Sequence, residues 1–513
     1  MNTRERVHLV WLKRDLRLHD HAPLAEASRR CAAGEKALAL YVRETDYWAT
    51  DKASADQWGF VAECLRDLAT NFDEINCPLL VAEAPSAEIV LESLFDHYGV
   101  AELLCHQETG NEWTFERDKR VLSLCRERGI PVREFLQNAV VRGRNRPPEK
   151  PEHQSFWREW ISGVQTTMPR FWNAPSTLPP QLAAPDLSTP ATVTRQRGGE
   201  GLALGLLESF LNERCLLHAG YRVEMGSPLH AHESCSRLSP HLTWGSLSTK
   251  RAAQASMARE PRPPHGSVMH RNSFHRRLRW RDHFLQKFES LPWMEFRCIN
   301  PSRETLHGWD QTAYDRWSTG MTGYPFVDAC MRSLNATKWI NFRARAMLVS
   351  YASYALNLDW RRFAPHLART FLDYEPGIHY SQLQMQSGTT YGSPPRIYNP
   401  IKQSLEKDPS GEFIRRWVPE LRDLSAEAIH LPHEASRHGY PAAIIPPGSL
   451  WRVMRSHGPK GAPKERLPQL ELDLGSQRPE IAQGALTGTN DPPSQYPRCP
   501  RNIGKRRAPK RLF

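Results

Sequence analysis

The first 135 residues alternate short apolar runs with amphipathic stretches, and this alternation limits the folds that the chain can adopt. The apolar runs are residues 7–12, 37–42, 78–82, 102–106 and 131–135, and stretches with helical spacing lie near 56–72, 86–97 and 112–128. Strands that alternate with helices form right-handed βαβ units, whose parallel sheet is covered on both faces. We therefore expect an α/β N-terminal domain over residues 1–135, with a five-stranded parallel, Rossmann-like sheet.

The pattern changes beyond residue 135. Residues 136–201 are rich in proline and poorly periodic, which predicts an interdomain linker. Over residues 202–447 the apolar spacing is mainly helical, so we expect an all-α C-terminal domain. Residues 448–513 are polar and end in a cluster of lysines and arginines, which predicts a basic, disordered tail. Such a tail is more often a solvated end than a binding element.

Composition narrows the classes of partner and site. The formal net charge of +12 and the pI near 9.3 favour a polyanionic partner. No apolar run is long enough to span a bilayer, and the N-terminus is typical of a first strand rather than a signal peptide. The ten cysteines form no CxxC pair, so no metal site is predicted. Scattered thiols fit a reducing, cytoplasmic location, and the oligomeric state stays open.

Charged residues are embedded in apolar, helix-compatible sequence between Trp317 and Glu375. A turn at residues 322–325 precedes apolar residues with helical spacing, and Arg343 and Arg345 lie in a second apolar segment. Asp373 and Glu375 follow a third segment, which Pro376 is expected to stop. Charges in such segments need partners. From these residues alone, a structural ion pair and a functional site are equally open.

The same stretch resembles the flavin-binding helical domain of the DNA photolyase and cryptochrome family. The resemblance rests on a long signature from Trp317 to Leu334, which includes ThrGlyTyrPro at 322–325, and it continues at residues 396–400 and 413–421. Similarity extends from about residue 7 to about residue 447. The resemblance implies FAD as cofactor and damaged DNA as partner. It predicts a deoxyribodipyrimidine photolyase-type lyase, in which blue light drives electron transfer from reduced flavin to split pyrimidine dimers.

The resemblance also implies a set of flavin-binding residues. A segment rich in small hydroxyl residues before a helix is a ready anion site, and here it resembles the loop that grips the FAD diphosphate, with Cys235 in place of the usual Thr. Arg345 and Asp373 match the pair that flanks the flavin ring, where a guanidinium stabilises negative charge. The predicted flavin-binding residues are Tyr221, Cys235, Ser236, Arg237, Leu238, Ser239, Arg281, Arg345, Asp373, Tyr374 and Glu375.

Further roles follow from the resemblance. Trp360 matches the middle member of the tryptophan chain that reduces the flavin, although a buried Trp is more often only core, and Trp309 is a candidate for the outer member. In the family's pattern His379 would face flavin N5, and Tyr380 is the nearest aromatic residue where the inner Trp is missing. Trp280 would form a wall of the pocket for a flipped base.

An antenna chromophore, a folate or another, is a further prediction. Asn111 and Glu112 stand at the start of a helix after the fourth apolar run, where folate-using relatives hold a pterin. From the residues alone, Asn111 could equally be a helix cap.

Several positions depart from the family's pattern. Arg277, which with Trp280 is a predicted DNA-binding residue, stands where a cyclobutane-dimer photolyase has a Glu. Ala346 replaces a Met, and residues 378–386 replace the usual segment after the acidic pair. These changes put the substrate in doubt more than the flavin. A cryptochrome-type blue-light photoreceptor without repair activity is therefore an alternative. A third is an α/β nucleotide-binding protein with an unrelated helical appendage, although GxGxxG is absent after the first strand.

Overall fold

A computed structural model describes residues 4–456, apart from residues 145, 178, 180, 181, 191, 261 and 393–395. The side chains of residues 451 and 453–456 are also left aside. The greater part of the predicted basic tail, from residue 457 on, lies outside the described residues.

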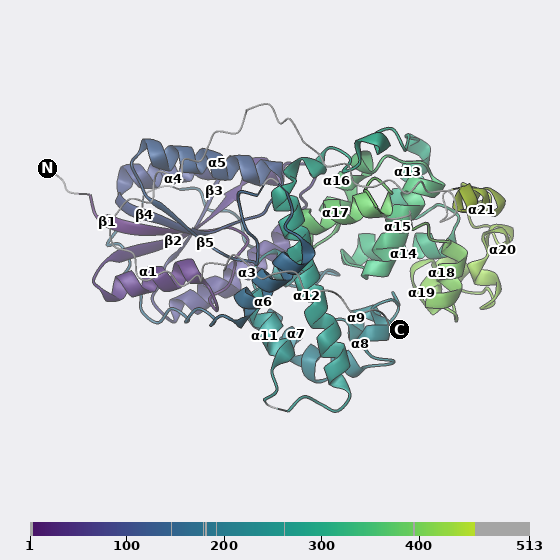
Figure 1. Cartoon of the computed structure of the whole chain (residues 1–513), viewed down its shortest axis with the longest axis horizontal. Coiled ribbons are helices and arrows are strands. Elements are labelled where there is room, and N and C mark those ends of the chain that lie inside the picture. Colours follow the sequence, from purple (N-terminus) through teal and green to yellow (C-terminus); the bar gives the residue numbers. More distant parts are fainter. Residues whose placement is uncertain are drawn as a thin grey trace, which may run out of the picture. The chain divides into compact units, whose positions relative to one another are not determined.

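The N-terminal region is built on a five-stranded sheet. Its strands are β1 Arg6–Leu12, β2 Lys36–Glu44, β3 Leu79–Ala84, β4 Gly99–His106 and β5 Val132–Phe135. Their order in the sheet is β3-β2-β1-β4-β5, and each neighbouring pair is parallel (Figure 1). This confirms the predicted α/β domain, because all five predicted apolar runs form strands of one parallel sheet.

Helices cover both faces of this sheet. Helices α1 (Ala22–Ala32) and α3 (Ala55–Asp73) contribute to one apolar core, and α4 (Ala87–His97) and α5 (Glu112–Glu127) contribute to a second. Strand β1 supplies both cores, because alternate side chains of a strand point to opposite faces. Val10 belongs to the first core, whereas Leu9 and Trp11 belong to the second. The carboxyl ends of the strands therefore lie within a sheet that is buried on both sides.

Beyond β5 the regular elements of the described chain are helices, which confirms the second half of the predicted fold. The longer elements are α6 Lys150–Ser162, α7 Glu200–Asn212, α11 Thr249–Met257, α12 Ser267–Ser290, α13 Gln311–Ser318, α14 Pro325–Thr337, α15 Phe342–Ser350, α16 Trp360–Thr370, α17 Pro376–Gln386, α18 Pro400–Lys407 and α21 Pro447–Ser456. The shorter elements include α2 Thr45–Trp48, α8 Tyr221–Glu224, α9 Ala231–Ser234, α10 Ser239–Thr243, α19 Glu412–Trp417, α20 Pro432–Arg437 and the 3-10 turn η2 Pro292–Glu295.

Two helices lie where the sequence predicted irregular chain. Helix α6 falls within the predicted linker, and its apolar side chains pack around the buried Trp157. Helix α21 begins where the disordered tail was expected to begin, and Leu450 joins the largest apolar core. Both helices were missed because their proline-rich neighbours obscured a short amphipathic pattern, and each helix contributes a buried apolar residue to a core.

The expected role of Pro376 was wrong. Helix α16 already ends at Thr370, and Pro376 is the first residue of α17. Proline is favoured there because the first residue of a helix needs no amide donor and its φ is already helical. The residues between these two helices therefore form a short connecting segment, which becomes important below.

The polypeptide just after β1 packs closely against the loop after α10. Gly245 adopts φ +74°, and a Cβ at this position would lie 2.0 Å from the Arg14 carbonyl oxygen. Arg17 donates a hydrogen bond to the Gly245 carbonyl at 3.0 Å, and the Leu16 amide donates to the Trp244 carbonyl at 3.3 Å.

In the described part of the chain, no helix combines the length and apolarity that a bilayer crossing requires.

Gly245→Ala is expected to lower the free energy of unfolding by about 3 kcal/mol or more, because the new methyl group meets backbone that cannot move aside. Gly439→Ala is the matched control, since Gly439 has φ +80° but open space around its Cα. The control should cost only the left-handed strain, about 1 kcal/mol. Chemical denaturation of both variants measures the difference, and equal losses would contradict the close approach at Gly245.

Candidate functional site

The segment Leu372–Glu375 connects α16 to α17 and is held by hydrogen bonds from several directions. The Trp244 indole donates to the Leu372 carbonyl at 2.9 Å, and the Leu372 amide donates to the Lys338 carbonyl at 2.9 Å. From the end of β1, the Arg14 guanidinium donates to the Tyr374 carbonyl at 2.5 Å. The acidic side chains of this segment are thereby presented in fixed positions.

Arg345 and Asp373 form the ion pair that the sequence predicted. Both terminal nitrogens of Arg345 donate to the two oxygens of Asp373, at 3.0 and 2.9 Å. The Arg345 Nε donates to the Ile340 carbonyl at 2.8 Å, and the guanidinium lies 4.2 Å from the centroid of the Phe371 ring. A two-pronged pair of this kind fixes the orientation of the guanidinium as well as its charge.

A second buried pair joins Arg281 to Glu375. Arg281 donates to the Glu375 carboxylate at 2.9 Å and also to Asp282 at 3.0 Å and Asn138 at 2.8 Å. Burial raises the pKa of the Glu375 carboxyl, while the nearby Arg14 and Arg281 act in the opposite direction. Arg14 and Arg281 thus form a compact network with the Glu375 and Asp282 carboxylates, which balance the charges of the two arginines.

Arg237 differs from these two arginines because it lacks a carboxylate partner. The residue has φ +61° and a half-buried side chain, whose guanidinium lies 4.0 Å from the Trp339 ring centroid and contacts the His232 ring nitrogen. Among the described residues, no carboxylate lies within ion-pair distance of it. Burial lowers the pKa of Arg237 to about 10. A half-buried guanidinium without a carboxylate in ion-pair distance suits an anionic ligand such as a phosphate.

The neighbours of Arg237 that the sequence predicted as flavin contacts form a short loop ahead of α10. Ser236 Oγ accepts a hydrogen bond from the Leu238 amide at 3.4 Å, and Ser239 Oγ accepts from the Trp339 indole at 3.1 Å. Burial raises the pKa of the Cys235 thiol to about 12, so this thiol remains neutral. The loop thus carries one half-buried cation, Arg237, and no negative group.

Tyr221 lies at the start of α8 and is buried. Its ring packs against Phe210, with centroids 5.1 Å apart, and against Phe274 at 6.4 Å. The next residue in the chain, Arg222, lines a cavity in the helical region. Tyr221 therefore supports one wall of that cavity from behind.

This cavity, called the basic cavity below, has a volume of about 490 Å³. Its lining consists of Arg222, Val223, Met225, Gly226, Ser273, Arg276, Arg277, Trp280, Phe342, Arg343 and Lys407. Five of these described lining residues are cationic and none is acidic, so the cavity attracts anions. Trp280 is 40% exposed, and the Phe342 ring lies between the guanidinium groups of Arg277 and Arg343, at 4.8 and 5.0 Å.

The structure thus brings the two predicted DNA-binding residues, Arg277 and Trp280, to the basic cavity. The predicted flavin residues are not among those that line it, and Asn341 connects the two groups. Its side-chain nitrogen donates to the Met225 carbonyl at 3.0 Å, while its side-chain oxygen is buried without a hydrogen-bond partner in the described structure. An unpaired buried acceptor beside the cavity is a place where a ligand could donate a hydrogen bond.

Aromatic rings cluster on α17 beside the Arg345 pair. His379 is buried, donates to the Ala364 carbonyl at 3.1 Å, and packs edge-on against Tyr374 and Tyr380 at 5.1 and 5.0 Å. Burial lowers the pKa of His379 to about 3, so its imidazole is neutral. The Tyr380 ring also lies 6.4 Å from that of Trp360, the buried first residue of α16.

Trp309, the other predicted electron-transfer residue, belongs to a different aromatic row. Its ring lies 5.0 Å from Tyr314 and 4.1 Å from the Arg362 guanidinium. Within the described part of the chain, no ring contact joins Trp309 to Trp360. The two residues are nevertheless close along the backbone, because Gly308 pairs with Leu358 in an isolated bridge.

Asn111 has the capping role that was one of its two interpretations. Its side-chain oxygen accepts a hydrogen bond from the Thr114 amide at 3.2 Å at the start of α5, and Asn111 itself is buried. The Glu112 side chain is exposed, while its amide donates to the Glu295 carboxylate at 2.9 Å. Their antenna role stays a prediction.

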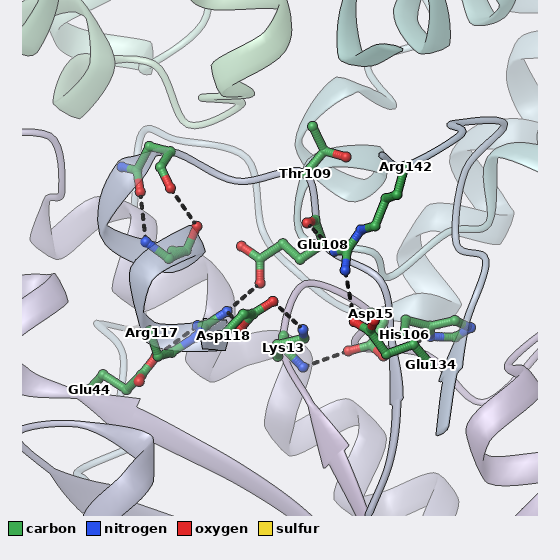
Figure 2. Close-up of polar contacts among 12 residues, drawn as sticks. Lys13, Asp15, Glu44, His106, Glu108, Thr109, Arg117, Asp118, Glu134 and Arg142 are labelled. Atoms are coloured by element: carbon green, nitrogen blue, oxygen red, sulfur yellow. Dashed lines mark hydrogen bonds and ion pairs between the residues drawn. The ribbon is translucent and has the colours of Figure 1, made fainter. Parts of the chain in front are cut away.

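The carboxyl ends of the strands hold a buried network of charges, shown in Figure 2. Arg117 donates to Glu44, Glu108 and Asp118 at 2.9, 2.7 and 2.7 Å, and Lys13 donates to Asp118 at 2.9 Å. The cavity beside this network is only about 40 Å³, close to the space of one water molecule. These ion pairs largely fill the sheet edge at which ligands of parallel sheets commonly bind.

Asp15, His21 and His106 also meet at this sheet edge, with ligand-type atoms within 4.8 Å of one another. Hydrogen bonding accounts for the arrangement. His21 Nδ1 accepts from the Leu24 amide at 3.2 Å, so its proton is on Nε2, which donates to Asp15 at 3.0 Å. A protonated nitrogen offers no lone pair to a metal.

Four residues that hold the site together were not predicted. Arg14 binds the Tyr374 carbonyl, Trp339 stacks on Arg237, and Lys52 donates to the Glu295 carboxylate at 2.6 Å. Each of these contacts joins residues more than 80 positions apart, which no local pattern could reveal. The sequence signals for Arg14 were its place just beyond the first predicted strand and a resemblance of residues 13–20 to the segment that opens the family's N-terminal domain.

Comparison with known proteins identifies the class to which this geometry belongs. Residues 274–448 match the family described as the FAD binding domain of DNA photolyase, and residues 8–176 match DNA photolyase. A deoxyribodipyrimidine photo-lyase of Streptomyces griseus is 30% identical over 443 residues, which cover 83% of this chain and 92% of that protein. A cryptochrome DASH of Gloeobacter violaceus is 26% identical over 488 residues, covering 85% and 92%.

A solved cryptochrome of Synechocystis sp. PCC6803 has the same fold, with a TM-score of 0.76, 24% identity, and coverage of 89% of this chain and all of that one. The chain belongs to the DNA photolyase and cryptochrome family, and its helical region is the FAD-binding domain of that family. FAD is the cofactor. Its anionic diphosphate fits the half-buried charge of Arg237, which has no carboxylate within ion-pair distance among the described residues, and Asn341 offers an unused acceptor beside the basic cavity.

Arg237→Ala is expected to reduce the fraction of purified protein that carries FAD, because the variant removes the half-buried cation that has no carboxylate in ion-pair distance among the described residues. Removing one charged hydrogen-bonding group costs about 1.5–3 kcal/mol of binding free energy, roughly a 10- to 150-fold loss of affinity. Arg128→Ala, which changes an exposed arginine on the α/β domain, is the control. Flavin release and absorbance give the occupancy, and full occupancy in Arg237→Ala would refute this role.

Acid should destabilise the folded protein through its buried histidines. A group with a lowered pKa in the folded state binds fewer protons there than in the unfolded chain. Burial lowers the pKa of His379 to about 3. Its contribution to stability is therefore complete above pH 6.5 and is lost as the pH falls toward 3. His379→Gln keeps a donor for the Ala364 carbonyl. Between pH 6 and 4 the unfolding free energy of this variant should fall less steeply than that of the wild type. The two slopes should differ by about 1.4 kcal/mol per pH unit. Identical slopes in chemical denaturation would contradict this.

Proposed function

We propose that this protein is a blue-light-driven DNA photolyase, in which reduced FAD passes an electron to a pyrimidine dimer. The observation that carries the proposal is the basic cavity. It combines five cationic side chains with a half-exposed tryptophan, within the domain whose family binds FAD. Cations suit the phosphates of DNA, and an exposed aromatic face suits an unstacked base.

The proposed substrate is damaged DNA with the lesion turned out of the helix. Duplex DNA keeps its bases stacked, so a lesion must leave the stack before it can enter a cavity, and a weakly paired lesion leaves most easily. Trp280 would stack on the lesion, while Arg277 and its neighbours would contact the flanking backbone. Affinity for DNA should therefore fall as the salt concentration rises.

The ion pairs around Leu372–Glu375 would stabilise the flavin in its reduced state. FAD, when bound and reduced, supplies the electron. Arg345 would stabilise the negative charge of the reduced ring, and Asp373 fixes the guanidinium through two hydrogen bonds of 3.0 and 2.9 Å. The neutral His379 adds no competing positive charge at this position.

Tyr380, Trp360 and Trp309 would return electrons to oxidised flavin. The contact between Tyr380 and Trp360, at 6.4 Å, supports the inner part of such a chain. The outer step to Trp309 would cross the short backbone bridge between Gly308 and Leu358. A folate antenna at Asn111 and Glu112 is a further proposal, and absorbance of a released pterin would test it.

A blue-light photoreceptor without repair activity is the second candidate. One observation favours it, namely that no acidic residue lines the basic cavity in the described structure. A carboxylate that could accept hydrogen bonds from the lesion is replaced by the exposed Arg277. This change would weaken recognition of dimer bases without affecting the flavin.

The test is repair of an oligonucleotide that contains one pyrimidine dimer, under blue light and with a reductant. The wild-type protein should remove the dimer, and Trp280→Ala should bind the damaged DNA more weakly by about 1–3 kcal/mol. Arg277→Ala should reduce the slope of log affinity against log salt concentration by about 1, which is the contribution of one phosphate contact. Lys119→Ala, on the exposed face of α5, is the control.

Flavin that is photoreduced while the dimers persist would overturn the repair proposal and favour the photoreceptor. Trp280→Ala with unchanged affinity for damaged DNA would instead mean that the lesion binds outside the basic cavity.

A further inference from the structure

The hydroxyl group of Tyr380 lies in a buried hydrogen-bonded row. It donates to Glu295 Oε1 at 3.2 Å and accepts from the Tyr374 hydroxyl at 3.2 Å. The ring stacks on Phe288 at 5.8 Å and contacts Trp360 at 6.4 Å. All four side chains around Tyr380 are buried, so bulk water has no part in this row.

Glu295 is the terminal acceptor of the row. It comes from the 3-10 turn η2, and its carboxylate is paired with Lys52 at 2.6 Å. Its other oxygen accepts from the Glu112 amide at 2.9 Å, at the N-terminus of α5. An ammonium group and a helix N-terminus both stabilise negative charge. Glu295 is therefore a buried carboxylate that is held in contact with a phenol.

This geometry has a redox consequence. A phenol is hard to oxidise while it keeps its proton, because its radical cation is strongly acidic. A base within hydrogen-bond reach, about 2.6–3.2 Å, removes the proton as the electron leaves. The Tyr380–Glu295 distance of 3.2 Å is within this range, whereas the indole of Trp360 has no hydrogen-bond partner among the described residues.

We propose that Tyr380 is a proton-coupled electron donor in this protein and that Glu295 is its proton acceptor. The inference rests on the proposed function, because the oxidant is the light-excited oxidised flavin. Tyr380 gives up one electron, its O–H bond breaks, and a new O–H bond forms at Glu295 Oε1. The products are a neutral tyrosyl radical, a neutral carboxylic acid and an acceptor reduced by one electron.

The same contacts supply the return step. Trp360, in ring contact with Tyr380, gives an electron to the tyrosyl radical, and the proton returns from Glu295 to the phenol oxygen. The positive charge then resides on the Trp360 indole. While Glu295 is neutral, Lys52 keeps an unbalanced charge, which favours return of the proton. Lys52 is thus a positioning residue that acts through Glu295.

Glu295 also links the α/β region to the helical region, so a purely structural role must be separated from this one. The test uses full-length protein loaded with FAD, and its first readout needs no variant. Frozen samples illuminated in the absence of external reductant are examined by electron paramagnetic resonance. We expect a tyrosyl radical signal in the wild type that is absent in Tyr380→Phe.

The second readout is the rate of flavin photoreduction in H₂O and D₂O. Glu295→Gln keeps the side-chain size but removes the base, and it should slow photoreduction on the order of 10²-fold and abolish the solvent isotope effect. Glu295→Asp, which keeps a carboxylate, should restore part of the rate. Glu289→Gln is the matched control, since Glu289 also bridges to the α/β region through Thr109 at 2.8 Å but is not placed in the row.

The outcomes separate the two proposals. A wild-type protein whose flavin is photoreduced without a tyrosyl signal, at a rate unchanged in Tyr380→Phe and Glu295→Gln, overturns the role of Tyr380 and leaves the proposed function standing. Equal slowing in Glu295→Gln and Glu289→Gln, with no isotope effect, shows a structural role only and also overturns it. Bound flavin that light does not reduce in the wild type contradicts both proposals.

Discussion

The structure depends on how the four residues Leu372–Glu375 are held. Arg14, Arg281 and Arg345 converge on this segment from three distant parts of the chain, and each contacts a different residue or the backbone. Charged hydrogen bonds in a buried place are strong when all partners are present and costly when one is missing. The α/β region, α12 and α15 are thereby tied to one connecting segment, and the position of the carboxylates is set by residues far from them in sequence.

Other positive charges in the helical region are not balanced by nearby carboxylates in this way. Arg237 is half-buried without a carboxylate in ion-pair distance among the described residues, and the basic cavity contains five cations without an acid among its described lining residues. A folded protein tolerates such an excess poorly unless a bound anion offsets it. The diphosphate of FAD would offset the first and the backbone of DNA the second, which is why the same helical region suits both ligands.

The sequence predicted the elements better than their contacts. The five strands and the helix after Tyr324 followed from local periodicity, which depends only on neighbouring residues. The Arg345–Asp373 pair followed from the family resemblance, and its residues do meet. By contrast, Pro376 was assigned to the wrong helix end, α6 and α21 were missed, and Glu295 and Lys52 were not considered. Their contact spans 243 positions, and long-range pairing leaves no trace in a single sequence.

The central claim is that Arg237 and the network around Leu372–Glu375 hold FAD in a state that light can reduce. The most direct measurement is the absorbance spectrum of the purified protein before and after blue light, together with the amount of flavin released on denaturation. The account predicts one FAD for each chain and an oxidised spectrum that bleaches on illumination with a reductant. Protein that folds with its arginines intact but contains no flavin, or flavin that light does not bleach, would contradict it.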